Sequence, residues 1–338
     1  MTLVKVATRQ DLERFVRLPW KIYQDQPCWV PPLVTERLQF LNPDINPFFE
    51  HATAELFLAL DTSGSPVGRI ALVHDRSYKE LYGESVGMFG MFESVDDPNV
   101  SGLLLDKAYQ WCLEKGFARL MGPMNLSTNH ECGLLVEGFD TSTMIGIPYN
   151  PEYYGHHFTA WGLQKEKDLL SMRLDLIAVP DYLERAVAKL KQRNRFSVRC
   201  MDLSQFDREM AIMWDVYNSA WSLNWGFVPM TQKEFEFSAK EMKSFVRPEF
   251  CFIAEVDGEP AGFSLALPDI SRVLKELGGS LFPFGWARFL WQKNKIDTFR
   301  VPVLGVKQKY RRLGIDAYLY HETYRSLMEN KTRFVEMS

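Results

Sequence analysis

Residues 301–328 constrain the fold more than any other part of the chain, because they prescribe three consecutive local structures. The apolar run VPVLGV predicts a strand, and the apolar pattern that starts at Ile315 predicts a helix. The turn between them carries four basic residues, Lys307, Lys309, Arg311 and Arg312. A helix that begins just after Gly314 directs backbone N–H groups and the positive end of its dipole toward this turn. The segment therefore predicts a binding site for a phosphate or pyrophosphate group.

The same residues resemble the acyl-CoA-binding motif of the GNAT acyltransferases, which runs Arg or Gln, two residues, Gly, one residue, Gly or Ala. Arg311, Gly314 and Ile315 stand where that family has them. Arg312 and Asp316 stand where the family often has glycine, so this turn is less permissive and carries a carboxylate near the expected pyrophosphate. The resemblance implies that acyl-CoA is bound by Leu304, Val306, Lys309, Arg311, Arg312, Gly314, Ile315 and Asp316.

Two alternatives stay open at this turn. Asp316 would also be explained by the helix dipole alone, because a carboxylate in the first turn stabilises a helix. The whole segment would also serve as an ordinary solvated connection between a strand and a helix. The flanking order of elements and the basic charge favour the ligand site.

Length and composition limit the class of protein. With 338 residues, of which 46% are hydrophobic, the chain can bury two cores of ordinary size. A net charge of −4 gives no global attraction to nucleic acid or anionic lipid. Five scattered cysteines without a C-x-x-C pair indicate reduced thiols. The first residues lack the apolar core of a signal peptide and no run approaches a membrane span, so we expect a cytoplasmic protein.

The same order of expected elements occurs twice, which predicts tandem domains. In the first half we expect a strand at 3–7, a helix at 9–18, a hairpin of 54–60 and 66–74, a strand at 87–95, a helix at 100–115 and a strand at 118–122. In the second half we expect a strand at 196–203, a helix at 206–221, a hairpin of 250–256 and 260–267, a strand at 299–306, a helix at 315–330 and a strand at 333–337. The expected fold is α/β (α+β): two GNAT-like domains, 1–176 and 196–338, joined by a linker or helix at 177–195. Each should have a mixed, mostly antiparallel sheet flanked by helices.

The two halves differ at the expected cofactor turn. After the strand at 87–95 the first half has Asp96, Asp97 and Pro98, which add two carboxylates and remove one N–H donor. This turn should repel a pyrophosphate, so cofactor binding is assigned to the second domain. Because the sequence ends soon after the strand at 333–337, we expect the second domain to be truncated and to lack the closing helix and strands of the GNAT family. The edge left exposed there would be covered by a further segment or by a homodimer partner.

The first half carries a version of the closing helix. Asn150, Tyr153 and Tyr154 resemble the Asn and Tyr of the GNAT helix, and a last strand is expected at 168–174. The resemblance implies that Tyr154 or Tyr153 protonates the leaving thiolate. The alternative is a tyrosine packed in the core with its hydroxyl bonded to a neighbour.

A polar segment, residues 122–140, follows the strand at 118–122. Asn125, Ser127 and Asn129 are candidate ligands of an acceptor, and Glu131 or His130 is a candidate general base. Asx and Ser/Thr turns that only satisfy local backbone groups explain the same composition. The blocks around these residues also resemble uncharacterised bacterial GNAT-like proteins, which imply no established substrate.

Histidine spacing predicts no metal site: His156 and His157 point in different directions on a helix, and these two and His321 are expected at the surface. Residues 269–298 form an insertion in the second domain with an aromatic-rich stretch at 277–291 and two lysines, Lys293 and Lys295. It would cover a long acyl chain, rest on a membrane surface, or pack on the core as a helical excursion, and the last is favoured.

The sequence therefore predicts an N-acyltransferase that binds acetyl-CoA or a longer acyl-CoA as co-substrate and needs no metal. A small-molecule or lipid amine would attack the thioester directly. Three rivals remain: a carrier-linked or aminoacyl-tRNA donor, long-chain transfer to a lipid amine, and a non-catalytic module that keeps the fold. Nucleic acid is expected as a partner only with a tRNA-linked donor.

Overall fold

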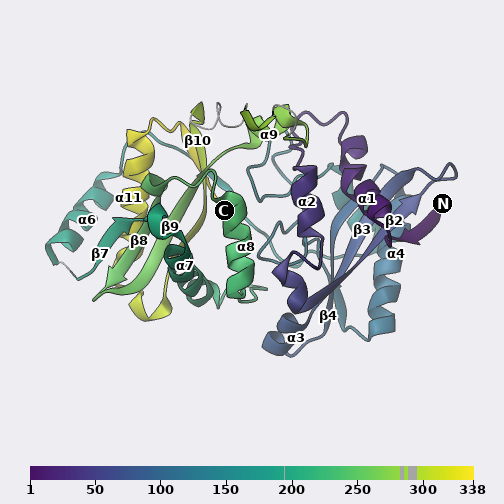
Figure 1. Cartoon of the computed structure of the whole chain (residues 1–338), viewed down its shortest axis with the longest axis horizontal. Coiled ribbons are helices and arrows are strands. Elements are labelled where there is room, and N and C mark those ends of the chain that lie inside the picture. Colours follow the sequence, from purple (N-terminus) through teal and green to yellow (C-terminus); the bar gives the residue numbers. More distant parts are fainter. Residues whose placement is uncertain (194, 282–284, 288–294) are drawn as a thin grey trace. The chain divides into compact units, whose positions relative to one another are not determined.

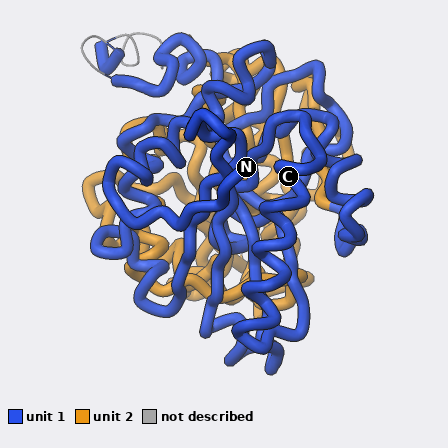
Figure 2. The backbone as a smooth tube through the Cα atoms, turned by 90° about the vertical axis from the view of Figure 1, so that its right-hand side faces the viewer, with its two compact units in different colours: residues 1–168, 271–287 blue, residues 169–270, 288–338 orange. Residues whose placement is uncertain are grey.

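The computed structural model describes residues 1–193, 195–281, 285–287 and 295–338. It divides into unit 1, residues 1–168 and 271–287, and unit 2, residues 169–270 and 288–338 (Figure 2). Of the aromatic-rich stretch at 277–291, residues 282–284 and 288–291 lie outside the described residues, as does Lys293, so the expectation that it packs on the core falls partly outside them. Each unit contains one mixed sheet flanked by helices, as expected (Figure 1).

Unit 1 is built on a five-stranded sheet of order β1-β2-β3-β4-β5. Its strands are β1 Thr2–Lys5, β2 Ala52–Leu60, β3 Pro66–Asp75, β4 Val86–Ser94 and β5 Arg119–Met121. Its helices are α1 Arg9–Ile22, α2 Val34–Phe40, α3 Arg76–Tyr82, α4 Pro98–Lys115, α5 Tyr153–Trp161 and α9 Ser271–Leu277, with a 3-10 turn at Pro47–Glu50. All pairs are antiparallel except β4 with β5. Apolar residues of α4 and α5 bury one face of this sheet.

Unit 2 is built on a six-stranded sheet of order β6-β11-β10-β9-β8-β7. Its strands are β6 Met172–Asp175, β7 Ser197–Cys200, β8 Cys251–Val256, β9 Glu259–Pro268, β10 Thr298–Val306 and β11 Phe334–Met337. Its helices are α6 Asp181–Arg193, α7 Phe206–Trp221, α8 Gln232–Met242 and α11 Ile315–Glu329, with 3-10 turns at Leu203–Gln205, Pro248–Phe250 and Gln308–Tyr310.

Helices α7 and α11 cover opposite faces of the second sheet (Figure 1). Ile253 packs with Met213 of α7, whereas its neighbour Ala254 packs with Leu319 of α11. This division follows from the alternation of side chains along a strand.

Local signals predicted several elements correctly. Thr8 caps α1: its hydroxyl accepts a hydrogen bond from the Asp11 amide at 3.1 Å, and the Asp11 carboxylate bonds back. Asp257 and Gly258 both have positive φ, of 51° and 82°, as the tight hairpin between β8 and β9 requires.

The strand expected at 168–174 as the end of the first domain instead belongs to the second sheet. It forms β6, which pairs antiparallel with β11 from Met172 opposite Met337 to Asp175 opposite Phe334. The division of the chain therefore falls between residues 168 and 169, before the boundary expected at 176. The edge of β11 that was expected to lack a partner is covered by β6.

Residues 271–287, expected in the second domain, are part of unit 1. Polar contacts explain this placement: Lys275 Nζ donates to the Pro27 carbonyl at 2.8 Å, and Ser271 Oγ donates to the Thr143 carbonyl at 3.1 Å. Trp20 Nε1 donates to the Gly278 carbonyl at 3.0 Å. These partners are distant in sequence, so no local pattern indicates them.

Replacing Leu174 with alanine tests the position of β6. Leu174 packs against the core group that contains Val335, so its truncation should lower the free energy of opening of β11 by about 1–2 kcal/mol. Hydrogen exchange of the β11 amides measures this loss. Ile177→Ala is the matched control, because Ile177 is 85% exposed and its truncation should change the opening energy by less than about 0.5 kcal/mol. Equal effects of the two variants would contradict the pairing.

Candidate functional site

A cavity of about 400 Å³ lies in unit 2 where β10 ends and α11 begins. It is lined by Ala220, Trp221 and Asn224 at the end of α7, by Leu304, Gly305 and Val306 of β10, and by Tyr310, Arg311, Arg312 and Asp316. Five of the residues predicted to bind the cofactor therefore surround one space: Leu304, Val306, Arg311, Arg312 and Asp316.

The backbone at the mouth of this cavity has two left-handed residues. Gly314, the residue that caps α11, has φ of 84°, and Arg312 has φ of 70°. The positive φ favours glycine here, and an added Cβ would also lie 2.9 Å from the Leu190 side chain of α6, which would have to shift. Among the described residues no side chain caps the first turn of α11, so its N–H groups remain available to an anion. Ile315, in contrast, is buried in the core.

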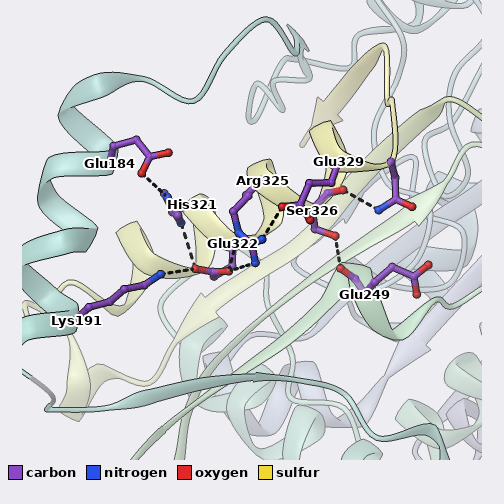
Figure 3. A network of polar contacts seen from close by, with 9 residues as sticks. Glu184, Lys191, Glu249, His321, Glu322, Arg325, Ser326 and Glu329 are labelled. Carbon is purple, nitrogen blue, oxygen red and sulfur yellow. Dashed lines mark hydrogen bonds and ion pairs between the residues drawn. The ribbon is translucent and has the colours of Figure 1, made fainter.

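Helix α6 is held against α11 by a polar network (Figure 3). His321 of α11 lies between two carboxylates: its Nε2 is 3.1 Å from Glu184 of α6, and its Nδ1 is 3.2 Å from Glu322. Lys191 of α6 lies 3.4 Å from the same Glu322. His321 was expected at the surface but is buried. The same expectation is wrong for His157, which is buried against Asp96. The network keeps Leu190 of α6 on the turn at Gly314.

Most of the basic side chains at the turn already have partners. Lys307 pairs with Asp215, and Lys309 pairs with Glu259 at 2.6 Å. The hydrogen bonds that Lys309 makes with Glu259 and Tyr310 raise its pKa to about 12. Arg311 donates to the Ala220 carbonyl at 2.9 Å and still lines the cavity, together with Arg312. The positive charge offered to an anion therefore comes chiefly from the two arginines.

The strand beside the cavity has one open edge. β11 pairs with β10 only from Thr298 to Val301, whereas β9 pairs with β10 as far as Val306. Within the described ranges, the other edge of residues 302–306 has no strand neighbour. The register with β9 also shifts between Arg300 and Val303. An extended ligand could bond to this edge in the manner of an added strand.

Gly305 brings the indole of Trp221 onto this strand. A Cβ on Gly305 would lie 2.1 Å from Cζ3 of Trp221, so glycine is needed for the approach. Trp221 is also stacked on Tyr217, at 5.0 Å between ring centroids. Neither Ala220 nor Asn224 was predicted from the sequence to line a binding site. Gly305 lies inside a predicted strand, and a glycine there indicates that another group approaches the backbone closely.

The corresponding edge of β4 in unit 1 is occupied by the chain itself. The Met124 amide donates to the Phe89 carbonyl at 2.8 Å, and the Met91 amide donates to Oδ1 of Asn125 at 2.7 Å. Farther along, the Ser94 amide donates to the Tyr154 hydroxyl at 2.8 Å. The Tyr153 hydroxyl donates to the Ser94 carbonyl at 2.7 Å. In unit 1 these groups take the hydrogen bonds that an extended ligand would make.

The turn after β4 has the features expected of a poor anion site. Asp97 caps α4 by accepting from the Asn99 amide at 2.9 Å, and Pro98 is the first residue of the helix. A capping carboxylate occupies the position that an anion would take at a helix N-terminus.

Tyr154 has little freedom to act as an acid. Its hydroxyl is 2.8 Å from Oε2 of Glu93, and its side chain is buried. Burial, and next the charge of Glu93, raise the pKa of Tyr154 well above its ordinary value. Glu93 in turn accepts from buried Arg69 at 3.3 Å. These contacts favour the core-packing alternative that the sequence left open.

Glu131 and its neighbours are also joined by polar contacts in unit 1. Glu131 pairs with Arg37 and accepts from Nδ2 of Asn125 at 2.6 Å. Burial alone would raise the pKa of Glu131, but Arg37 and Asn125 outweigh burial and hold this pKa below its ordinary value. Ser127 Oγ lies 2.9 Å from Nδ1 of His130. The Asn129 amide donates to the same Oγ at 3.2 Å. The predicted acceptor and base residues thus form two hydrogen-bonded groups, Asn125 with Glu131, and Ser127 with His130 and Asn129.

A structural role for Glu131 predicts that its contribution to stability depends on pH. Because its folded-state pKa is lowered, Glu131 adds stability above its unfolded-state value and loses this contribution as the pH falls through and below about 4.5. Glu131→Gln should therefore lower the free energy of unfolding of unit 1 by about 2 kcal/mol at pH 7, and by much less near pH 3.5. Urea unfolding at both pH values measures the difference. Glu137→Gln, an exposed site in the same segment, is the control. A difference that is independent of pH would contradict the account.

No described helix has the length and apolar character needed to cross a membrane. No group of three or more His, Cys, Asp or Glu side chains among these residues could hold a metal ion.

Comparison with known proteins gives both close relatives and distant structural neighbours. The chain is 37% identical to protein YghO of Escherichia coli strain K12 over 341 residues, which cover 98% of this chain and 86% of that protein. It is also 37% identical to the bacterial ceramide synthase of Caulobacter vibrioides over 315 residues, which cover 92% of this chain and 82% of that protein. No protein-family model matches.

Two solved structures share the fold across 99% of this chain. One is a tandem GNAT protein from the clavulanic acid biosynthesis pathway, with a TM-score of 0.52 and 10% identity over 89% of that chain. The other is the glucosamine N-acetyltransferase region of a fungal multidomain β-N-acetylglucosaminidase, with a TM-score of 0.56 and 12% identity over 35% of that chain. The chain is therefore a tandem GNAT-fold protein that belongs to the same family as protein YghO and the bacterial ceramide synthase.

Proposed function

We propose that this protein transfers an acyl group from acyl-CoA to an amine acceptor, and that unit 2 binds the donor. The observation that carries the proposal is the cavity at the open edge of β10, which adjoins the uncapped N-terminus of α11. Arg311 and Arg312 line the same cavity. An acyl-CoA combines an anionic group with an extended amide-bearing arm, and this site matches both parts.

In this proposal each part of the site has one task. The first amides of α11, with Arg311 and Arg312, would bind the diphosphate. The backbone of residues 302–306 would bond the pantetheine arm along its open edge. The amine then attacks the thioester carbonyl directly, and alignment of the two reactants supplies a large part of the rate. No step requires a covalent intermediate on the protein.

A long-chain donor and a lipid amine are the finer part of the proposal. One relative is named a bacterial ceramide synthase. A ceramide is an amide between a fatty acid and a long-chain amino alcohol, so its formation is acyl transfer to an amine. We propose the same substrate classes here.

A carrier-linked donor is the second candidate, and one observation favours it. Lys307 and Lys309 are paired with carboxylates, and Asp316 adds a third carboxylate at the cavity. The reduced positive charge suits the single phosphodiester of a carrier-bound phosphopantetheine better than the several charges of CoA.

Reversing the charge of the two arginines tests the assigned site. Arg311→Glu with Arg312→Glu should weaken binding of CoA and palmitoyl-CoA about 100-fold, because two charge-assisted contacts become repulsive. Calorimetric titration measures the affinity, and thermal unfolding checks the fold. The control, Arg208→Glu with Lys240→Glu, changes the net charge equally at exposed positions of α7 and α8. Equal affinity of the two double variants would remove this site from consideration. If wild-type protein bound no CoA thioester but bound an acyl-carrier protein, the carrier-linked donor would replace acyl-CoA as the proposed donor.

Asp316→Asn provides a test with the opposite sign. Removing a carboxylate from the cavity should tighten CoA binding by about threefold to tenfold, because repulsion of the diphosphate is relieved. The same change should slightly destabilise α11, since the carboxylate lies in its first turn. Calorimetry and thermal unfolding measure the two effects. Asp96→Asn in unit 1 should leave affinity unchanged. Weaker binding by Asp316→Asn would show that the carboxylate contributes to the ligand site.

A further inference from the structure

His321 is buried between two carboxylates that belong to different helices (Figure 3). Its Nε2 lies 3.1 Å from Glu184 of α6, and its Nδ1 lies 3.2 Å from Glu322 of α11. A neutral imidazole has one N–H donor and one acceptor, whereas the imidazolium has two donors. Ionised carboxylates only accept hydrogen bonds, so both contacts are hydrogen bonds only when His321 carries a positive charge.

The charges of the network balance when His321 is protonated. Arg325 lies 2.8 Å from Glu322 and 2.6 Å from Glu329, and Lys191 lies 3.4 Å from Glu322. Burial would raise the pKa of Glu322, but Arg325 and Lys191 outweigh burial and hold this pKa below its ordinary value. With Glu184, the network holds three carboxylates, which Lys191, Arg325 and a charged His321 neutralise.

Groups from the neighbouring elements complete the surroundings of this network. Glu249, in a 3-10 turn beside α11, pairs with Arg247 at 2.6 Å. Cys200 of β7 lies near Glu249, and burial raises the pKa of its thiol. The sheet residues in the core groups that α11 joins are apolar. Among the described groups here, a histidine is the kind of side chain that changes charge between pH 5 and 8.

The network lies on the face of α6 that covers the proposed donor turn. Val187 of this face is 1% exposed, and Nζ of Lys191 lies 5.2 Å from the ring centroid of Tyr318. The neighbouring Leu190 packs on Gly314, the left-handed residue before the first amides of α11. Glycine has more conformational freedom than any other residue, so a side chain that covers it lowers the entropy lost when an anion binds. Release of α6 would therefore weaken anion binding at this turn.

We propose that the charged form of His321 positions α6 on the donor turn, so that donor affinity falls when His321 loses its proton; this inference rests on the proposed function. His321 acts here as a positioning residue, through Leu190. When the imidazolium loses a proton, one contact loses its N–H donor and a nitrogen lone pair faces a carboxylate. The docked position of α6 is therefore favoured at low pH, where His321 is charged, and is weakened as the pH rises.

Calorimetric titration with dephospho-CoA at pH 5.5 and pH 8.0 tests this inference. The probe keeps the diphosphate but lacks the 3′-phosphate, since a phosphate monoester itself titrates at about pH 6. Wild-type affinity should fall about fivefold from pH 5.5 to pH 8.0. His321→Gln, which replaces the imidazole with an uncharged amide, should bind more weakly than wild type at pH 5.5. Its affinity should be the same at both pH values.

Glu184→Gln gives a second variant that is expected to keep the fold, because the Glu184 side chain is 55% exposed. Without this carboxylate the pH dependence of affinity should fall below about twofold. Asp181→Asn removes an exposed carboxylate from the first turn of the same helix and is the control, which should retain the wild-type dependence. Hydrogen exchange of the α6 amides without ligand is an independent measurement. Protection of α6 should fall from pH 5.5 to pH 8.0 in wild type but not in His321→Gln.

The outcomes separate this inference from the proposed function. Equal pH dependence of affinity in wild type, His321→Gln and Glu184→Gln would overturn the role of His321 and leave the donor site intact. If protection of α6 fell with rising pH while donor affinity stayed constant, the coupling of α6 to the donor turn would be wrong. Failure of wild-type protein to bind CoA or dephospho-CoA at either pH would overturn both proposals.

Discussion

Backbone N–H and C=O groups on an open strand edge need hydrogen-bond partners, and the two units meet this need in opposite ways. In unit 1 the chain supplies the partners: Met124, Asn125, Tyr153 and Tyr154 bond to the edge of β4. In unit 2 the corresponding edge of β10 borders a cavity. Within the described residues the same fold thus has one edge filled by the chain and one edge without a strand neighbour, and this difference underlies the proposed assignment of donor binding.

Electrostatics at the two turns agree with the difference between the edges. In unit 1 a capping aspartate occupies the N-terminus of α4. In unit 2 the N-terminus of α11 follows an uncapped left-handed glycine beside Arg311 and Arg312. Leu190 packs on that glycine, and the polar contact of His321 with Glu184 and the ion pair of Lys191 with Glu322 hold its helix in place. The shape of the proposed anion site therefore depends on contacts made by residues that do not line the cavity.

Local sequence signals predicted much of the fold, because caps, turns and periodicity act over a few residues. The helix at 206–221, the hairpin at Asp257 and the turn at Gly314 are examples. Long-range pairing was not accessible in this way. A four-residue strand such as β6 does not indicate which sheet it joins, and the register that brings Glu336 opposite Arg300 follows only from the assembled sheet. The polar segment around Asn125 has the composition of a binding loop, and only its contacts favour the role of filling a strand edge.

Hydrogen exchange of the full chain with and without CoA tests the central claim most directly, because it reports on both edges in one experiment. The account predicts slower exchange at the amides of residues 302–306 and in the first turn of α11. Exchange at Met91 and Ser94 of unit 1 should be unchanged, since those amides already have partners. Protection of β4 on addition of CoA, with none at β10, would contradict the assignment of the donor site to unit 2.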